Sequence, residues 1–397
     1  MQGLIGPLKE LAEFEELCKN KKKDVGMIRV CGCVNSQKSH MMYALGDGCK
    51  YKVIACSSET KAKQIYEEYR FLDSNTYLYP AKDFLFYQAD IRSKELVKQR
   101  MEGIQAVLSG EPVTVVTSLD GFMDHLAPKE SIAEKVLKIQ NDSVLKLDEM
   151  AEKLSVIGYD REVQGEGPGQ FAVRGGILDI YPLTEELPVR IELWGDEVDS
   201  IRTFDVESQR SIENLMDIVI YPAVEFPQNG EKGVSFLDYF PPEDTILFLD
   251  EPVRLVERGQ NIEDEFMEAQ KKRLESGYDL EEEEAKIFPV TEILKKINCY
   301  SSIGFYALGM KCKGLEVRES YEIQAKSVNP YNNSFEMLTQ DLKRLKRNGY
   351  RVILLSGSRT RAKRLAEDLR DYNLSSYYSE DLDREVKPGE IITAYGY

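Results

Sequence analysis

The sequence predicts an α/β protein in which a parallel-sheet domain carries an inserted α+β module and is followed by a small α/β domain. Three observations lead to this fold class. Buried-strand patterns alternate with helical patterns over about the first 120 residues, short turn-bounded strands then replace them, and the alternation later returns. The chain of 397 residues is also longer than one hydrophobic core supports, so several domains are expected.

The first region, residues 1–122, has the pattern of a parallel sheet covered on both faces. Short apolar runs predict buried strands, and longer segments with apolar residues at helical spacing predict the helices between them. The predicted strands are residues 25–30, 51–56 and 112–117, and the predicted helices are residues 59–71 and 93–108. Strands that alternate with helices in this way pair in parallel.

The second region, residues 123–207, predicts a small antiparallel sheet with one helix. An amphipathic pattern predicts the helix, and Gly, Pro and Asp turns separate the strands. The helix is expected at residues 144–157, and the strands at residues 171–173, 176–181, 189–194 and 198–204. Gly195 and Asp196 stand between the last two strands, where a hairpin turn is expected.

After this insertion the α/β pattern returns. Residues 208–324 are expected to complete the first domain, and residues 325–397 to form the small C-terminal domain. The predicted elements are strands at 245–250, 303–308, 315–323, 350–356 and 390–394 and helices at 252–284, 335–347 and 360–372. Because the chain stops directly after an apolar strand, we expect the last domain to be truncated.

Composition limits the possible functions. A net charge of −17 disfavours sequence-independent DNA binding over a broad surface, which needs many Lys and Arg residues. No apolar run is long enough for a membrane span, and the polar start lacks a signal peptide core, so a cytoplasmic protein without a membrane partner is expected. Seven scattered cysteines and two histidines predict reduced, structural thiols and no metal site.

One segment partly matches a phosphate-binding loop. In the pattern G-x-x-x-x-G-K-[ST], Gly32, Lys38 and Ser39 are in register, between a strand and a helix expected at residues 40–45. Gln37 replaces the second glycine, at a position where a side chain crowds the backbone that wraps the phosphate. No cofactor is therefore expected.

A second fragment of a nucleotide site follows another strand. Asp250 and Glu251 end the apolar run 245–250, as in the acidic motif that holds Mg²⁺ in ATPases. Many strands end in this way, so the pair is weak evidence by itself. Together the two fragments indicate a nucleotide-binding scaffold that is retained without turnover.

The inserted region carries a specific resemblance. The segments 168–182, 188–205 and 208–211 resemble domain 2 of the nucleotide excision-repair family that includes UvrB and the bacterial transcription-repair coupling factor, Mfd. Residues 79–83, Arg100, residues 115–118 and residues 220–223 resemble the same family, and the similarity is weaker after residue 325. The chain thus looks like the N-terminal UvrB-homology region of the coupling factor. The resemblance implies a degenerate RecA/helicase-like parallel sheet with a UvrB domain-2-like insertion.

Two departures separate this sequence from UvrB. The phosphate loop is damaged, and only residues 84–91 stand where UvrB has the long aromatic β-hairpin that grips DNA. Both losses are typical of the coupling factor. The family's RNA polymerase-binding domain and ATP-dependent DNA translocase motor would follow this chain, so RNA polymerase and DNA are expected to be partners only of parts that are missing here.

The resemblance implies that domain 2 binds UvrA through Arg174, Arg190 and Trp194. The strand pattern agrees, because Arg190, Glu192 and Trp194 alternate with Ile191 and Leu193 and so share one face. An aromatic residue beside arginines is typical of a protein-binding hot spot. The residues alone favour a surface Arg–Glu ladder with a half-covered tryptophan, and the resemblance shifts the choice to an interface. Glu192 is expected to orient the arginines, and Asp179 receives no chemical role.

The sequence leaves three hypotheses about function. The first is a binding module for UvrA that is not itself an enzyme. The second is a UvrB-like ATP-dependent DNA helicase domain with an active nucleotide site, and Gln37 argues against it. The third is a regulatory clamp whose UvrA-binding face is masked by another part of the full-length protein.

Overall fold

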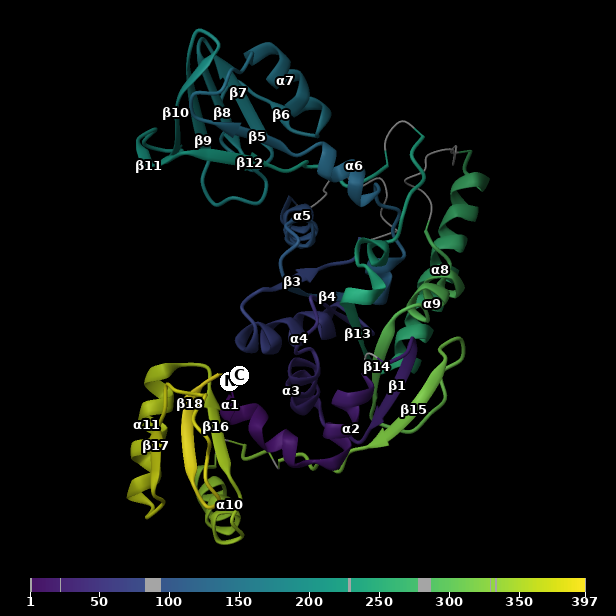
Figure 1. Ribbon diagram of the computed structural model, residues 1–397, viewed down its shortest axis with the longest axis vertical. Helices are drawn as coiled ribbons and strands as arrows, with labels where there is room; N and C mark the ends of the chain where they lie inside the picture. The colour runs from purple at the N-terminus through teal and green to yellow at the C-terminus, as the bar shows by residue number, and fades with distance from the viewer. Residues whose placement is uncertain are drawn as a thin grey trace.

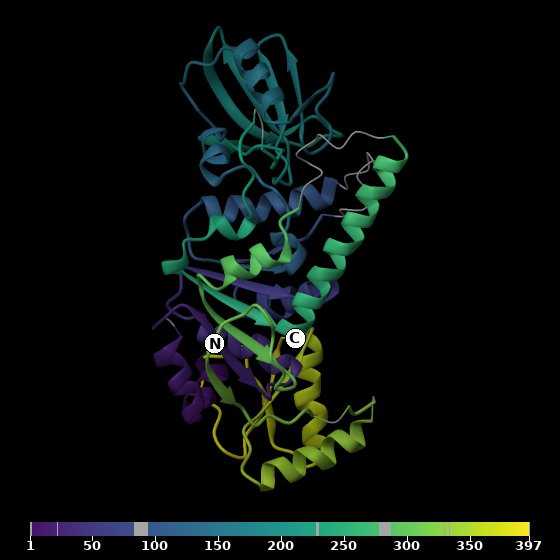
Figure 2. The same cartoon turned by 90° about the vertical axis from the view of Figure 1, so that its right-hand side faces the viewer.

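The computed structural model describes residues 2–21, 23–82, 94–227, 230–277, 287–328, 330–332 and 334–396. A central parallel-sheet domain lies between the inserted module at one end and the small C-terminal domain at the other (Figure 1). The turned view shows the same order, with a long helix running along one side of the central domain (Figure 2). Two segments of the prediction lie outside the described residues: 84–91, and the end of the helix expected at 252–284.

The central sheet has seven strands that all pair in parallel, in the order β15-β1-β14-β13-β2-β4-β3. The strands are β1 (Gly26–Cys31), β2 (Tyr51–Cys56), β3 (Thr76–Tyr79), β4 (Val113–Ser118), β13 (Thr245–Asp250), β14 (Ser301–Tyr306) and β15 (Val317–Glu322). The predicted α/β class with a parallel sheet is confirmed. The strands before and after the insertion interleave, so both halves of the chain build one sheet.

Helices cover both faces of this sheet because its strands are apolar on both sides. Consecutive residues of β13 enter different cores: Ile246 and Phe248 face one, and Leu247 and Leu249 the other. On the first face lie α2 (Ala12–Asn20), α3 (Asn35–Leu45) and α4 (Glu59–Leu72), and on the second lie α5 (Lys94–Leu108), α8 (Pro252–Glu275) and α9 (Val290–Ile297). Short helices complete the domain: α1 (Gln2–Ile5), η1 (Gly6–Glu10), η2 (Leu119–Phe122), η3 (Phe236–Tyr239) and η4 (Pro242–Asp244).

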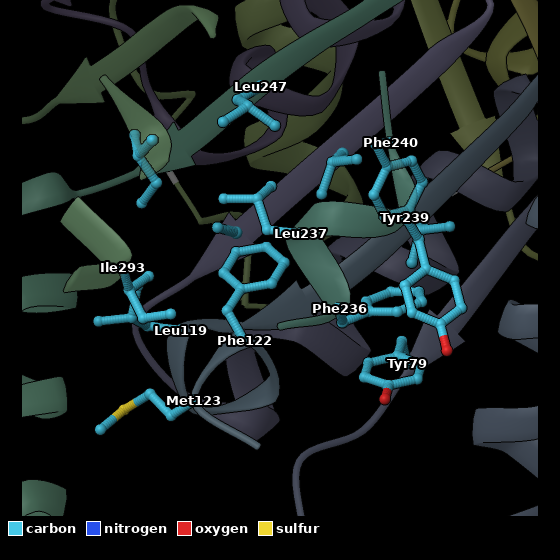
Figure 3. Packing of buried hydrophobic residues seen from close by; sticks show 14 of the residues in the cluster. Tyr79, Leu119, Phe122, Met123, Phe236, Leu237, Tyr239, Phe240, Leu247 and Ile293 are labelled. Carbon is cyan, nitrogen blue, oxygen red and sulfur yellow. The ribbon is translucent and has the colours of Figure 1, made fainter. Parts of the chain in front are cut away.

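The core of the second face is rich in aromatic side chains. Tyr79 and Phe236 stack with ring centroids 3.7 Å apart, and Phe240 meets Phe236 edge to face at 5.2 Å. Figure 3 shows these rings packed with Leu237 and Leu247 over the sheet. Sequence-distant segments therefore meet in one core, which holds the chain leaving the insertion against the first strands.

The inserted module has its own sheets. Six strands pair in the order β11-β10-β9-β8-β7-β6, and β5 and β12 form a separate antiparallel pair. The elements are α6 (Lys129–Glu134), β5 (Leu137–Gln140), α7 (Leu147–Val156), β6 (Asp160–Arg161), β7 (Gln170–Arg174), β8 (Ile177–Tyr181), β9 (Val189–Trp194), β10 (Glu197–Phe204), β11 (Ser211–Leu215) and β12 (Asp217–Ile220). The module extends beyond the predicted residue 207, because β11 pairs with β10 and β12 pairs with β5.

The helix of the module is shorter than the predicted 144–157. It begins at Leu147, because residues 143–145 run alongside the β9–β10 hairpin and bond to it. The amide of Leu145 donates to the carbonyl of Asp196, and Val144 pairs with Glu197. The amphipathic pattern did not distinguish a helical turn from this short extended segment.

The C-terminal domain is a three-stranded parallel sheet in the order β16-β18-β17. Its elements are α10 (Phe335–Arg347), β16 (Val352–Ser356), α11 (Arg359–Asp371), β17 (Ser376–Tyr378) and β18 (Ile391–Tyr395). It touches the start of the chain, where the amide of Gly3 donates to the carbonyl of Leu382 at 2.8 Å and Arg351 pairs with Glu10 at 2.7 Å. Within the described ranges, no helix is both long and apolar enough to cross a membrane.

Candidate functional site

The sheet of the inserted module has an apolar face and a charged face. Phe171, Leu178, Ile191 and Ile201 are buried on the apolar face in the core of the module, which α7 also lines. The residues between them face the other way, since side chains alternate along a strand. Strand register places Ala172, Asp179, Arg190 and Arg202 directly opposite one another across β7, β8, β9 and β10. The predicted alternation along β9 is thus confirmed.

Asp179 is the centre of the charged face. Its side chain is only 2% exposed, and it accepts hydrogen bonds from two arginines. Arg190 reaches it at two points, Nε to Oδ1 at 2.7 Å and Nη2 to Oδ2 at 2.9 Å. Arg174 adds a third bond, Nη2 to Oδ2 at 2.5 Å. One buried carboxylate therefore fixes both arginines that the resemblance assigns to UvrA binding.

Arg190 is more enclosed than the sequence predicts. Its side chain is 13% exposed, whereas that of Arg174 is 43% exposed. The guanidinium lies 4.3 Å from the ring centroid of Phe204, and Nη2 also donates to Oε1 of Gln209 at 2.7 Å. The hydrogen bond to Asp179 raises the pKa of Arg190. Arg190 is thus partly structural, and only a small part of its side chain is open to solvent.

Trp194 is the most exposed large hydrophobic residue among the described ones, at 85%. It ends β9 at the Gly195-Asp196 turn, beside the β7–β8 turn, where the amide of Leu193 donates to the carbonyl of Gly176. Strand register places Trp194 opposite Glu197, which in turn pairs with Val144, and Val144 is 78% exposed. Trp194 therefore lies on the same face as the arginines, and Glu197 separates it from the exposed Val144.

Glu192 does not orient Arg174 or Arg190, contrary to the expectation. It accepts a hydrogen bond from Arg202 on β10 and lies 3.4 Å from the hydroxyl of Ser200. This pair forms the cross-strand Arg–Glu contact that the residues alone suggested. The residue that orients the arginines is Asp179. Its position between Leu178 and Ile180 was the available signal, because alternation along the strand turns it to the face opposite the core.

The degenerate nucleotide site has a different geometry from a phosphate loop. β1 ends at Cys31 and α3 begins at Asn35, five residues earlier than the helix expected at 40–45. The amides of Gln37 and Lys38 donate to the carbonyl of Val34 at 3.0 and 3.1 Å, inside the first turn of the helix. These are N–H groups that a phosphate loop would direct at its ligand. The helix therefore begins where a loop was predicted, and the predicted helix start at residue 40 is wrong.

Lys38 is held by the two acidic residues that follow β13. Its Nζ lies 2.7 Å from Oδ1 of Asp250 and 2.6 Å from Oε1 of Glu251, and its side chain is only 3% exposed. Burial lowers the pKa of Lys38, but the attraction of Asp250 and the hydrogen bonds to both carboxylates outweigh it and raise the pKa above its usual value. The lysine thus stays charged and neutralises carboxylates that would otherwise face Mg²⁺.

The other residues predicted for this site also have protein partners. The hydroxyl of Ser39 donates to Oε2 of Glu68 on α4 at 2.6 Å. Glu251 accepts from the amide of Ala307 at 2.9 Å. Gly32 has a φ of +85°, and a Cβ there would lie 2.1 Å from the carbonyl oxygen of Ile323, so the strand end tolerates only glycine. The structure brings Lys38, Asp250 and Glu251 together in one ion cluster, whereas Ser39 and Gly32 contact other parts of the chain.

A buried charge network attaches the inserted module to the central domain, and the sequence alone did not predict it. Arg100 on α5 is fully buried; its Nε lies 2.7 and 2.9 Å from the two oxygens of Glu225, and its Nη2 lies 2.7 Å from Asp124. Lys82 contacts both carboxylates at 2.8 and 3.0 Å. Asp124 precedes the module and Glu225 follows it, so Arg100 fixes both connecting segments.

Over the described part of the chain, no group of three or more His, Cys, Asp or Glu side chains is placed to hold a metal ion. The carboxylates that cluster instead surround Lys38 or Arg100.

Comparisons with known proteins match this geometry to a repair family. Residues 137–226, which include the charged face, match the family described as the UvrB interaction domain. The transcription-repair-coupling factor of Bacillus subtilis (strain 168) is 25% identical over 450 residues, which cover 98% of this chain and 38% of that protein. That of Staphylococcus haemolyticus is 23% identical over 390 residues, 81% of this chain and 32% of that protein.

A shorter match has a higher identity. The transcription-repair-coupling factor of Staphylococcus aureus (strain Mu50) is 34% identical over 158 residues, 40% of this chain and 13% of that protein. The chain therefore contains a UvrB interaction domain within a region that is homologous, over most of the chain, to the N-terminal part of transcription-repair-coupling factors. The chain spans 38% of the length of the Bacillus relative and 32% of the Staphylococcus haemolyticus relative.

Proposed function

We propose that this chain is the part of a transcription-repair-coupling protein that recruits UvrA, the damage-recognition ATPase of nucleotide excision repair. The binding surface is the charged face of the inserted module, with Arg174, Arg190 and Trp194 as its contact residues. The observation that carries this proposal is the 85% exposed Trp194 on the same sheet face as two arginines, within the residues that match the UvrB interaction domain. Exposed tryptophan beside arginine is the composition of a binding hot spot.

The surface is suited to a partner that presents carboxylates next to an apolar side chain. Arg174 is 43% exposed and keeps donors on Nε and Nη1 that are not used by Asp179. Arginine pairs with carboxylates at two points, which fixes the orientation of a partner as well as attracting it. Trp194, which is 85% exposed, supplies apolar area on the same face. The whole chain has a net charge of −17, which disfavours the binding of acidic proteins away from these arginines.

We further propose that the chain does not turn over ATP. Two features of the degenerate site support this: the amides of Gln37 and Lys38 are engaged within α3, and the Lys38 ammonium is paired with Asp250 and Glu251. A nucleotide would have to displace two buried or partly buried ionic contacts before its phosphates and Mg²⁺ could bind. Contacts with RNA polymerase and with DNA are assigned to parts of the protein outside this chain.

Titration of purified UvrA against the 397-residue chain tests the proposal. Calorimetry or biolayer interferometry should give a 1:1 complex that weakens with salt, and Trp194→Ala should weaken it by about 30-fold or more, the usual effect of losing a hot-spot residue. Val156→Ala is the matched control, because Val156 is 56% exposed on α7, which packs on the opposite, apolar face of the sheet. If Trp194→Ala binds like wild type, the site is misplaced.

A further inference from the structure

The two arginines of the charged face share one buried carboxylate, and this arrangement has a cost. Asp179 is 2% exposed, so its desolvation must be offset by both cations. For generic attraction of an acidic partner the carboxylate is a disadvantage, because it removes positive charge from the surface. The carboxylate must therefore have a role other than attracting an acidic partner.

The geometry of the bonds between Asp179 and the two arginines indicates this role. The Nε–Nη2 edge of Arg190 is fully used by Asp179 and Gln209, and the ring of Phe204 lies against its guanidinium. The planar group therefore has one orientation, with Nη1 free. Arg174 is fixed at Nη2 and presents its remaining donors to solvent. Long side chains lose much rotamer freedom when they bind, and a fixed side chain has already lost it.

We propose that Asp179 is a positioning residue for partner binding: it holds Arg174 and Arg190 with their unused N–H groups directed at carboxylates of the partner. The inference rests on the proposed function and adds to it that geometry, not net positive charge, determines affinity at this face. Asp179 itself does not touch the partner.

The test compares two substitutions that each remove one negative charge from the same face. Asp179→Asn has nearly the same shape but releases the arginines, whereas Glu192→Gln breaks only the contact with Arg202. If net charge decided affinity, both variants would bind the proposed carboxylates of UvrA more tightly. If geometry decides, Asp179→Asn binds about tenfold or more weakly, mainly through faster dissociation, while Glu192→Gln binds as wild type or slightly faster.

Thermal melts and Trp194 emission check that the variants are folded, since Trp194 is the chain's single tryptophan and lies on this face. If Asp179→Asn does not fold, Arg190→Lys replaces it: the charge is kept, the two-point bond is lost, and the same weakening is expected. Equal affinity of wild type and these variants overturns the positioning role alone. Failure of the wild-type chain to bind UvrA overturns both this inference and the proposed function.

Discussion

Replacing Lys38 with methionine tests whether the degenerate nucleotide site has become a structural ion cluster. Lys38 is 3% exposed and contacts Asp250, which is 1% exposed, and Glu251, which is 19% exposed. Removal of one partner from a buried ion pair typically costs about 3–5 kcal/mol, because the remaining charge stays buried without compensation. Methionine fills a similar volume, so little of the loss arises from a cavity.

This loss is large enough to measure by calorimetry. For a domain of this size about 1 kcal/mol corresponds to roughly 2–4 °C in Tm, so Lys38→Met is expected to melt about 6–20 °C below wild type. The double variant Lys38→Met/Asp250→Leu should recover much of the difference, since an apolar pair can replace a buried ion pair at little cost. Lys61→Met is the control, because Lys61 lies on the nearby helix α4 and is only partly buried at the surface.

The same calorimetry addresses nucleotide binding. If the lysine were free to bind phosphate, Lys38→Met would destabilise the chain by less than about 1 kcal/mol and so lower its Tm by less than roughly 2–4 °C. MgATP would then raise the Tm of the wild-type chain. That pair of results would refute the assignment of Lys38 to an internal cluster. It would favour the competing interpretation as an ATP-dependent helicase domain.

The remaining predictions concern the module, its attachment and DNA. Trp194→Ala should abolish most UvrA binding and leave the Tm unchanged. Arg190→Ala should also lower the Tm, because Asp179 then keeps only one cation. A Tm of Arg190→Ala equal to that of the wild type would contradict the structural role of Arg190. Burial raises the pKa of Glu225, but attraction to Arg100 outweighs it and lowers the pKa from 4.5 to about 2. The stabilisation from this group is complete above pH 4.5 and is lost as the pH falls toward 2, about 3 kcal/mol in all. The free energy of unfolding of Glu225→Gln should therefore change less with pH over this range than that of the wild type. Fluorescence anisotropy should find only weak binding of duplex DNA at physiological salt, given the charge of −17, and submicromolar, salt-resistant binding would contradict this.

Much of the architecture could be predicted because it follows from local patterns. Apolar runs placed β1, β2, β4 and β13 within about two residues, and helical spacing placed α4 and α10 equally well. The alternation of Arg190, Ile191 and Glu192 along β9 also follows from strand geometry alone. Short edge elements such as β6 and β17 have too few residues to show a period, and they were missed.

The partnership of Asp179 with Arg190 was only partly predictable. The two residues are direct neighbours across β8 and β9, but the connection between these strands, residues 182–188, is too long to fix their register. The β9–β10 turn is tight, yet a bulge between Val198 and Ser200 shifts the pairing beyond it. Strand patterns give the face of each residue, and only the folded sheet gives its neighbour.

The sequence by itself determined the element types, the buried faces and the interruption of one α/β domain by another module, because each is a property of a few consecutive residues. The tertiary structure alone decided where the charges pair. Lys38 meets Asp250 across 212 residues and Arg100 meets Glu225 across 125. Such contacts depend on how parallel strands order themselves within a sheet and on which segments the core brings together, and no local spacing encodes that order.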